Sequence, residues 1–199
     1  SLHVELENTN YKNSWDLWTY SQKRDVEEGT VKGICVTRDA ARFNECVKKK
    51  SKVLYIPRHE DIIKNSVGGL FITDFWNYIS YRSTAQRMGK VPSPGTFGLL
   101  INSEHPIFNL FPTDFHTNWQ WWNLVINSRP MILDDYEREY SPIVQVVDNW
   151  DRNHQLGLIY EVPESDGNAI ICASDLFSCK ENVEVKALFE SILSYLQNR

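Results

Sequence analysis

The fold is decided by the alternation of VKGICVT (31–37), RDAARFNECVKKK (38–50) and KVLYIP (52–57). The first and third runs are short, apolar and rich in β-branched residues, which indicates buried strands. The middle run follows Thr37, a residue type that caps helix N-termini. Strand, helix and strand in this order predict a parallel βαβ unit.

The same alternation continues to about residue 135. We expect a short helix or turn at 59–66, strands at 68–74 and 97–103, a helix at 76–89 with Gly89 at its C-terminal cap, a helical stretch within 111–130 and a short strand at 131–135. This order predicts an α/β fold with an open, mostly parallel, flavodoxin-like sheet and helices on both faces.

The last third of the chain has closely spaced strands at 142–148, 156–162 and 168–175. Their spacing predicts an added antiparallel hairpin or mixed arrangement at a sheet edge. A final helix is predicted from apolar residues at helical intervals: Val185, Leu188, Phe189, Ile192 and Leu196.

Residues 1–30 differ from the α/β domain expected over 31–199. Two short strands, 4–8 and 14–20, surround a polar turn, and 21–30 is a charged linker. Aromatic residues occur on both faces of the second strand, which predicts burial on both faces or a place at an interface.

The composition is that of a folded globular domain, with 199 residues, 42% of them hydrophobic and 24% charged. The net charge of −5 argues against a nucleic-acid partner. We expect no membrane insertion, because no apolar run reaches the ~18 residues that a spanning helix needs. The first residues form neither a signal peptide nor a Met start, so we expect a piece of a longer protein.

No cofactor or metal site is expected. The Gly pair of SVGGLF (66–71) enters a predicted strand, whereas a nucleotide-binding loop leaves one. Cys35 and Cys172 fit small core positions, and Cys179 lacks the flanking glycines of a nucleophile elbow. The five histidines have no zinc-ligand spacing; they are His3, His59, His105, His116 and His154.

Three aspartates, Asp74, Asp148 and Asp175, come at the carboxyl ends of predicted strands, where open α/β sheets form ligand crevices. The loop after the strand 142–148 adds further polar residues: Asn149, Arg152, Asn153 and His154. Together with His116 these groups could form a polar pocket. The alternative is that they only cap helices and tie loops together.

The segment FPTDFHTNWQWWNLVIN (111–127) has a helical apolar stripe: Phe115, Trp119, Trp122 and Ile126. We expect this stripe to pack on the sheet, which leaves Trp121 on the polar side. The predicted carbohydrate-binding residues are therefore Asp74, Trp76, His116, Trp121, Asp148, Asn149 and Arg152.

Several segments resemble, in order, the C-terminal region of family 2 glycoside hydrolases of the β-galactosidase type from gut Bacteroidetes. They are YKNSWDLWTY (11–20), GGLFITDFWNY (68–78), GTFGLLINSEHPIF (95–108), FPTDFHTNWQWWNLVINSRPMILD (111–134), PIVQVVDNWDRNHQLGLIYEV (142–162) and NAIICASDL (168–176). The resemblance implies a class I glutamine-amidotransferase-like domain without a nucleophile, after the last strand of a β-sandwich. It also implies that the catalytic residues lie on a separate barrel and that the protein is periplasmic or at the cell surface.

Three functions remain open. The first is a non-catalytic accessory domain that packs on the catalytic and β-sandwich domains of such an enzyme or assembles a homo-oligomer. The second is a carbohydrate-binding module that stacks exposed tryptophans on an oligosaccharide. The third is an independent α/β hydrolase or amidotransferase that uses a non-standard site, such as Asp74 with His116.

Overall fold

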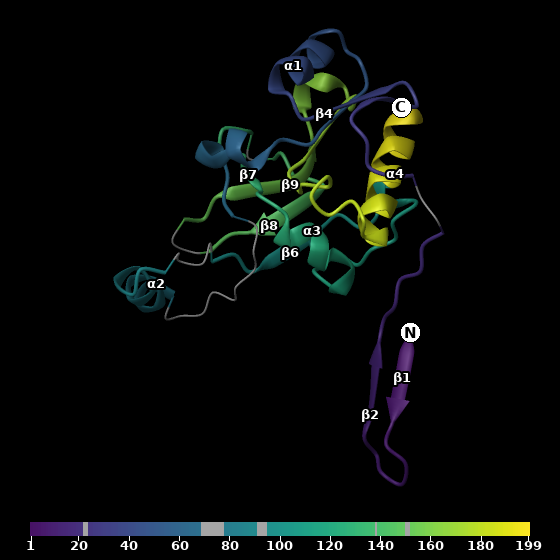
Figure 1. Ribbon diagram of the computed structural model, residues 1–199, viewed down its shortest axis with the longest axis vertical. Coiled ribbons are helices and arrows are strands. Elements are labelled where there is room, and N and C mark those ends of the chain that lie inside the picture. Colours follow the sequence, from purple (N-terminus) through teal and green to yellow (C-terminus); the bar gives the residue numbers. More distant parts are fainter. Residues whose placement is uncertain (22–23, 69–77, 91–94, 138, 150–151) are drawn as a thin grey trace.

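Eight strands form one mixed sheet in the described part of the chain, and helices cover both of its faces (Figure 1). The computed structural model describes residues 1–21, 24–68, 78–90, 95–137, 139–149 and 152–199. The strand order is β3-β4-β5-β10-β9-β8-β6, and β7 pairs with β9 beside this path. The strands are β3 (Gly29–Val31), β4 (Ile34–Thr37), β5 (Val53–Tyr55), β6 (Gly98–Ile101), β7 (Met131–Ile132), β8 (Val144–Val147), β9 (Gln155–Glu161) and β10 (Ala169–Cys172). The α/β class is therefore confirmed.

The predicted βαβ unit is present, with α1 (Ala40–Lys48) connecting the parallel strands β4 and β5. The helix cap differs from the prediction. Asp39 caps α1 by accepting a hydrogen bond of 2.7 Å from the Arg42 N–H, and the Thr37 hydroxyl accepts one from the Asp39 N–H. A carboxylate directly before the first turn also complements the helix dipole.

The single strand expected at 31–37 is a hairpin instead. β3 and β4 pair antiparallel, with Val31 opposite Ile34. Lys32 and Gly33 between them have φ values of 52° and 78°. Two consecutive positive φ angles define the type I′ turn, whose twist matches that of paired strands, and glycine takes this conformation without strain.

The prediction of a mostly parallel sheet is wrong. β5 pairs parallel with both β4 and β10, whereas the other described pairings are antiparallel. The antiparallel order of β8, β9 and β10 is confirmed, but these strands lie in the middle of the sheet rather than at its edge. The strands β8, β9 and β10 take this position because β10 pairs with β5, which places the C-terminal strands beside the βαβ unit.

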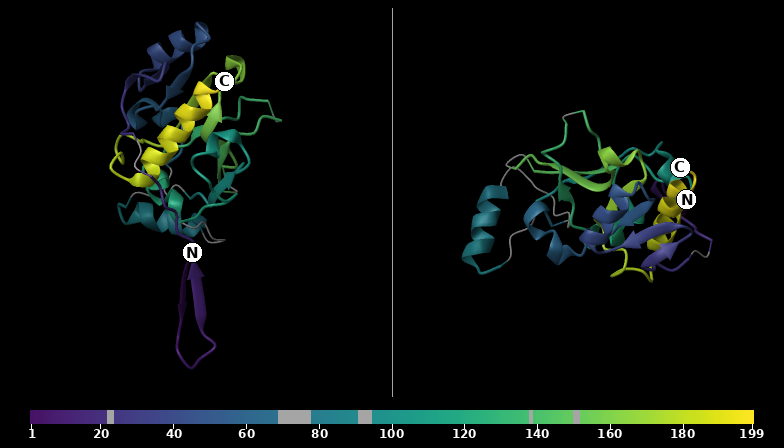
Figure 2. Two further views of the ribbon diagram at one scale, coloured as in Figure 1. Left: turned by 90° about the vertical axis from the view of Figure 1, so that its right-hand side faces the viewer. Right: turned by 90° about the horizontal axis from the view of Figure 1, so that it is seen from above.

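The sheet buries one apolar layer on each face. Val53 and Tyr55 of β5 pack with Phe43 of α1, whereas Leu54 and Ile56 point to the opposite face. That opposite face is covered by α4 (Val183–Gln197), as Figure 2 shows from two further directions. Helices on both faces are thus confirmed.

The final helix is confirmed in position and in orientation. Its five predicted core residues are all fully buried. Ser191 fixes the helix to η3 (Pro106–Phe108), because its hydroxyl donates to the Ile107 carbonyl at 2.5 Å and accepts from the Leu110 N–H at 3.1 Å. The predicted apolar face therefore covers the sheet, and a polar residue within it holds a neighbouring loop.

The remaining short elements follow the predicted order. They are η1 (His59–Asp61), η2 (Ile63–Asn65), α2 (Tyr78–Arg87), η4 (Trp119–Trp121), α3 (Trp122–Ile126) and η5 (Pro163–Ser165). Gly89 ends α2 as expected, with φ 68° and a hydrogen bond from the Lys90 N–H to the Ala85 carbonyl. The strand predicted at 68–74 lies almost entirely outside the described residues.

The N-terminal segment forms a separate hairpin that extends away from the main sheet (Figures 1 and 2). β1 (Leu2–Glu5) pairs antiparallel with β2 (Lys12–Trp15). Between this hairpin and β3, Val26 is buried, and Lys186 of α4 forms an ion pair of 2.6 Å with Asp25. The end of the connecting segment is thus packed on the domain, whereas the hairpin itself is exposed.

We predict that Gly157→Ala destabilises the protein by about 1–3 kcal/mol, the usual cost of overpacking a core. A Cβ at this position would lie 2.5 Å from Leu133 Cδ1 and 2.8 Å from Tyr160 Cδ1, both in the buried layer. Urea unfolding measures the loss. Leu133→Ala should offset part of it, because it removes the nearer methyl group; strictly additive losses in the double variant would contradict the predicted clash.

Candidate functional site

The three clustered tryptophans are arranged in the opposite way to the prediction. Trp121 is fully buried, whereas Trp119 is 71% exposed and Trp122 is 52% exposed. The Trp121 ring packs edge-on against Phe108 and Phe111, and its indole N–H donates to the Thr113 hydroxyl at 2.8 Å. Trp121 is therefore a core residue and cannot contact a sugar.

The reason lies in the local backbone. One helix was expected from residue 115, but helical structure begins only after Asn118, whose side chain accepts a hydrogen bond from the Gln120 N–H at the start of η4. Within the predicted stripe, the rings of Trp119 and Trp122 contact each other, and the stripe is exposed to solvent instead of packing on the sheet. Its members are all exposed: Phe115, Trp119, Trp122 and Ile126.

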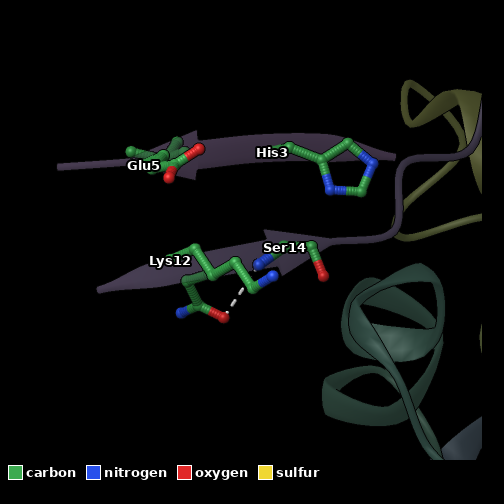
Figure 3. Close-up of a pocket in the computed structure, with 6 residues that line it drawn as sticks. His3, Glu5, Lys12 and Ser14 are labelled. Atoms are coloured by element: carbon green, nitrogen blue, oxygen red, sulfur yellow. Dashed lines mark hydrogen bonds between the residues drawn. The ribbon is translucent and has the colours of Figure 1, made fainter. Parts of the chain in front are cut away.

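The N-terminal hairpin has one polar and one apolar face. The cross-strand pairs His3 with Ser14 and Glu5 with Lys12 form the polar face, which Figure 3 shows. The alternate positions, Leu2, Val4 and Trp15, form the apolar face, because neighbouring residues of a strand point to opposite sides. The apolar face is exposed to solvent, which is costly unless another surface covers it.

The apolar face of the hairpin meets the exposed tryptophans at one hollow of about 380 Å³. We call the exposed apolar side chains of this region the aromatic surface. It consists of Leu2, Trp15, Leu17, Trp119, Trp122 and Val183. Trp122 belongs to it through its ring contact with Trp119, at 6.1 Å between centroids. Two carboxylates, Asp16 and Glu184, also line the hollow.

Tyr20 fixes this surface to the domain. Its ring stacks on Phe111 at 5.8 Å, and its hydroxyl accepts a hydrogen bond from the Gln120 side chain. Gln120 is buried and also donates to the Pro112 carbonyl at 2.9 Å. Burial raises the pKa of Tyr20 to about 12, so the hydroxyl stays protonated at neutral pH. The segment that leads to the hairpin is thus anchored next to Trp119.

The predicted polar site around Asp148 is a hydrogen-bonded network. The Asp148 side chain, which is 2% exposed, forms an ion pair of 2.5 Å with Arg152. It also accepts hydrogen bonds from the backbone N–H groups of Asn149 and His154. Asn149 is buried and accepts from the Arg152 N–H at 2.9 Å. The structure thus brings these three predicted residues together, and they hold the loop rather than open a pocket.

His154 extends this network to Asp134, because its Nδ1 lies 2.6 Å from Oδ2 of the Asp134 carboxylate. Partial desolvation raises the pKa of Asp134, but hydrogen bonds from His154 and from the Gln155 N–H outweigh it, so the net pKa is lowered. The same carboxylate therefore bridges the loop after β8 and the segment after β7. Asp134 was not predicted as part of the group.

The other predicted residues do not join Asp148. Leu100 of β6 bridges to His116 and pairs with Gln145 of β8, so β6 separates His116 from β8. His116 is exposed, and its Nδ1 lies 3.1 Å from the Thr117 carbonyl. Asp74 and Trp76 lie outside the described residues, so the pairing of Asp74 with His116 stays a prediction.

A second polar group lies at the carboxyl ends of the parallel strands β4, β5 and β10. Asp175 follows β10 as predicted and forms an ion pair of 2.9 Å with Arg38, which follows β4. His59 and Arg129 lie near this pair, because the charges of Asp175, Arg129 and Arg38 all influence the pKa of the His59 imidazole. No sequence pattern pointed to these two residues, since they come from separate segments with no shared motif.

The thiols of Cys172 and Cys179 show no feature of a nucleophile. Cys172 and Cys179 are buried, and burial raises the pKa of each to about 12. All four cysteines are free. No group of three metal-ligating side chains occurs within the described ranges, and no helix there is long and apolar enough to cross a membrane.

Residues 34–199 match the model of the family described as domain of unknown function DUF8487, so the chain belongs to this family. The matched range begins at β4 and includes the whole βαβ unit, the antiparallel strands and α4. The N-terminal hairpin and β3 lie outside it. No curated protein matches the chain.

We predict that Asp148→Ala lowers the free energy of unfolding by about 3–5 kcal/mol, because it leaves a partly buried arginine and two backbone N–H groups without their acceptor. Asp114→Ala is the control, since Asp114 is exposed and accepts one hydrogen bond from Asn118. Its cost should stay near 0.5 kcal/mol. Equal unfolding midpoints of the two variants in urea would contradict the role of Asp148 in the loop.

Proposed function

We propose that the chain is a non-catalytic accessory domain that binds a sheet-containing protein domain through the aromatic surface. The observation that carries the proposal is the exposure of Trp119 and Trp122, at 71% and 52%, on one side of a well-packed domain. Large contiguous apolar patches are uncommon on soluble monomers and mark interaction sites. Tryptophan is also the residue type most enriched in the energetic centres of protein interfaces.

The hairpin supports a sheet as the partner. A two-stranded hairpin is marginally stable alone, and β1 and β2 have no further strand beside them in the described residues. Each therefore presents one unpaired backbone edge, which is a template for adding strands. The apolar face with Leu2, Val4 and Trp15 would pack on the core of such a sheet.

The resemblance to the C-terminal region of family 2 glycoside hydrolases suggests which partner this is. In such an enzyme the hairpin would complete a β-sandwich, and the aromatic surface would face that sandwich or the catalytic barrel. The parallel strands β4, β5 and β10, with helices on both faces, would then be the flavodoxin-like part of an amidotransferase-like domain. The proposal extends to a periplasmic or cell-surface location and to homo-oligomers assembled through the same surface.

Carbohydrate binding is the second candidate, and a specific observation favours it. The tilted rings of Trp119 and Trp122, 6.1 Å apart, lie next to a hollow lined by the carboxylates of Asp16 and Glu184. Aromatic faces and carboxylate acceptors together suit the apolar faces and hydroxyl groups of a pyranose. The two candidates share residues, so binding experiments must separate them.

For the protein partner, we predict a stoichiometric complex with separately produced β-sandwich and catalytic domains of a resembling family 2 enzyme, detected by sedimentation velocity. Trp119→Ala should weaken it about 30-fold, which corresponds to the ~2 kcal/mol of an interface hot spot. Met88→Ala is the matched control, because it removes an exposed apolar side chain next to α2. A complex that forms equally well with Trp119→Ala, or no complex with either domain, would contradict the proposal.

Hydrolysis of aryl glycosides by the chain alone would contradict its non-catalytic character.

For the carbohydrate candidate, we predict heat release on calorimetric titration with galactosides and a change of tryptophan fluorescence that saturates with them. Both signals should disappear in Trp119→Ala, because Trp119 lines the hollow and the buried Trp121 cannot contact a ligand in its place. A panel of galactosides and plant or host glycans that produces neither signal argues against this candidate and leaves the protein interface as the explanation of the surface.

A further inference from the structure

The carboxyl ends of β4, β5 and β10 meet at one edge of the sheet, because these three strands are parallel. Arg38 follows β4, His59 begins η1 after β5, and Asp175 follows β10. Arg129 reaches the same edge from the loop before β7, where its backbone N–H donates to the Ala173 carbonyl at 2.8 Å. Ligands of open α/β sheets bind outside this end of parallel strands.

Asp175 is fully occupied by its neighbours. Its carboxylate accepts hydrogen bonds from the Ser178 hydroxyl at 2.6 Å and from Arg38 Nη2 at 2.9 Å, besides the Phe177 N–H. Partial desolvation raises the pKa of Asp175, but these hydrogen bonds and the Arg38 charge outweigh it, so the pKa is lowered and the group is ionised. Its negative charge therefore balances Arg38.

The charge of Arg129 has no carboxylate partner within the described segments. Its Nη2 lies 3.5 Å from the Ile63 carbonyl, which is a neutral acceptor. Arg38, Arg129 and Asp175 are the charged groups that act on the His59 imidazole. With His59 neutral, these side chains sum to one positive charge, and the Glu28 carboxylate accepts a hydrogen bond from the Arg38 backbone N–H at 3.0 Å. A partly buried positive charge of this kind favours an anion beside it.

Three side-chain nitrogens of this group are buried without a hydrogen-bond partner in the part of the chain that the structure describes. They are Nε of Arg38, Nε of Arg129 and Nε2 of His59. Leaving one such group unpaired costs about 1–3 kcal/mol, so three in one place call for a bound partner. Hydrogen bonding to the Ala173 backbone favours the imidazolium and so raises the pKa of His59. In the neutral ring with its single proton on Nδ1, Nε2 can accept, and it can donate once it is protonated.

We propose that Arg38, His59 and Arg129 bind a small oxyanion, a carboxylate or a phosphate group, at this edge of the sheet. The two guanidinium Nε–H groups donate to its oxygens, in the charge-assisted geometry that suits planar carboxylates and phosphates. His59 Nε2 takes up a proton and becomes the third donor. The site is independent of the aromatic surface, so either assignment can fail without the other.

The proton linkage gives the site a signature. Desolvation and the two arginines lower the pKa of free His59, whereas Asp175 raises it. An anion beside Nε2 favours the imidazolium, so its binding raises the pKa of His59. By linkage, affinity increases as the pH falls through that pKa. Acetate stays ionised where imidazole titrates, and therefore isolates the histidine contribution.

The test is an NMR titration of the histidine ring resonances of the intact chain with inorganic phosphate and with acetate, at constant ionic strength. We expect the His59 resonances to shift saturably and its pKa to rise with at least one of them; the one that binds more tightly identifies the source of the oxyanion. The proposal would be overturned if the His59 resonances showed no saturable shift with phosphate and none with acetate. This measurement needs no variant.

Two variants and a control sharpen the result. Arg129→Gln should raise the half-saturating concentration about tenfold, the effect of losing one charged hydrogen bond. His59→Gln keeps an amide donor near Nε2 but does not titrate. Its binding of acetate, followed on backbone amide resonances because the ring is absent, should persist and lose its pH dependence. Arg58→Gln removes the same charge from the exposed residue beside His59 and should leave binding unchanged. An equal loss in Arg58→Gln and Arg129→Gln would show general charge attraction and overturn the site.

Discussion

The pairing of β10 with β5 and β9 is the constraint on which the rest of the structure depends. Every residue of β10 is buried, and Ile170 lies opposite Leu54 on one side and Glu161 on the other. β10 runs parallel to β5 and antiparallel to β9, so it joins the βαβ unit to the antiparallel strands in one sheet. The apolar layers on the two faces can be continuous only because this strand is in the middle, and α4 directly follows it to cover one of them.

Local periodicity predicted the elements well and their arrangement poorly. The residues of α4, the end of α2 at Gly89 and the strand β5 were all evident in the sequence, because each depends on neighbouring positions. Strand direction depends on which strands pair across the sheet, and no single segment contains that information. The β3–β4 hairpin is different: Lys32-Gly33 between two buried apolar residues was a readable turn signal that the continuous apolar run concealed.

The tryptophan cluster shows what periodicity cannot decide. The spacing of Trp119 and Trp122 correctly indicated a common face, but spacing does not tell whether that face points to the sheet or to solvent. Trp121 is buried because the chain turns at Asn118, so that a single 3-10 turn directs its ring between Phe108 and Phe111. An apolar face that is exposed in an otherwise satisfied domain is thus more informative about function than the same residues in the core.

The two polar groups of the sheet differ in a way that bears on function. Around Asp148 most partners come from one loop and hydrogen-bond one another, so their proximity in sequence was a guide to their contacts but not to a pocket. At the edge of β4, β5 and β10, side chains from four distant segments meet, and three of their nitrogens keep unused hydrogen-bonding capacity. Asp175 could be predicted at this edge because it directly follows a strand. No sequence pattern could predict that Arg38, His59 and Arg129 come close to Asp175. Three buried nitrogens of arginine and histidine side chains without a hydrogen-bond partner in one part of the described structure reduce stability, and their number makes the carboxyl edge the stronger candidate for a ligand.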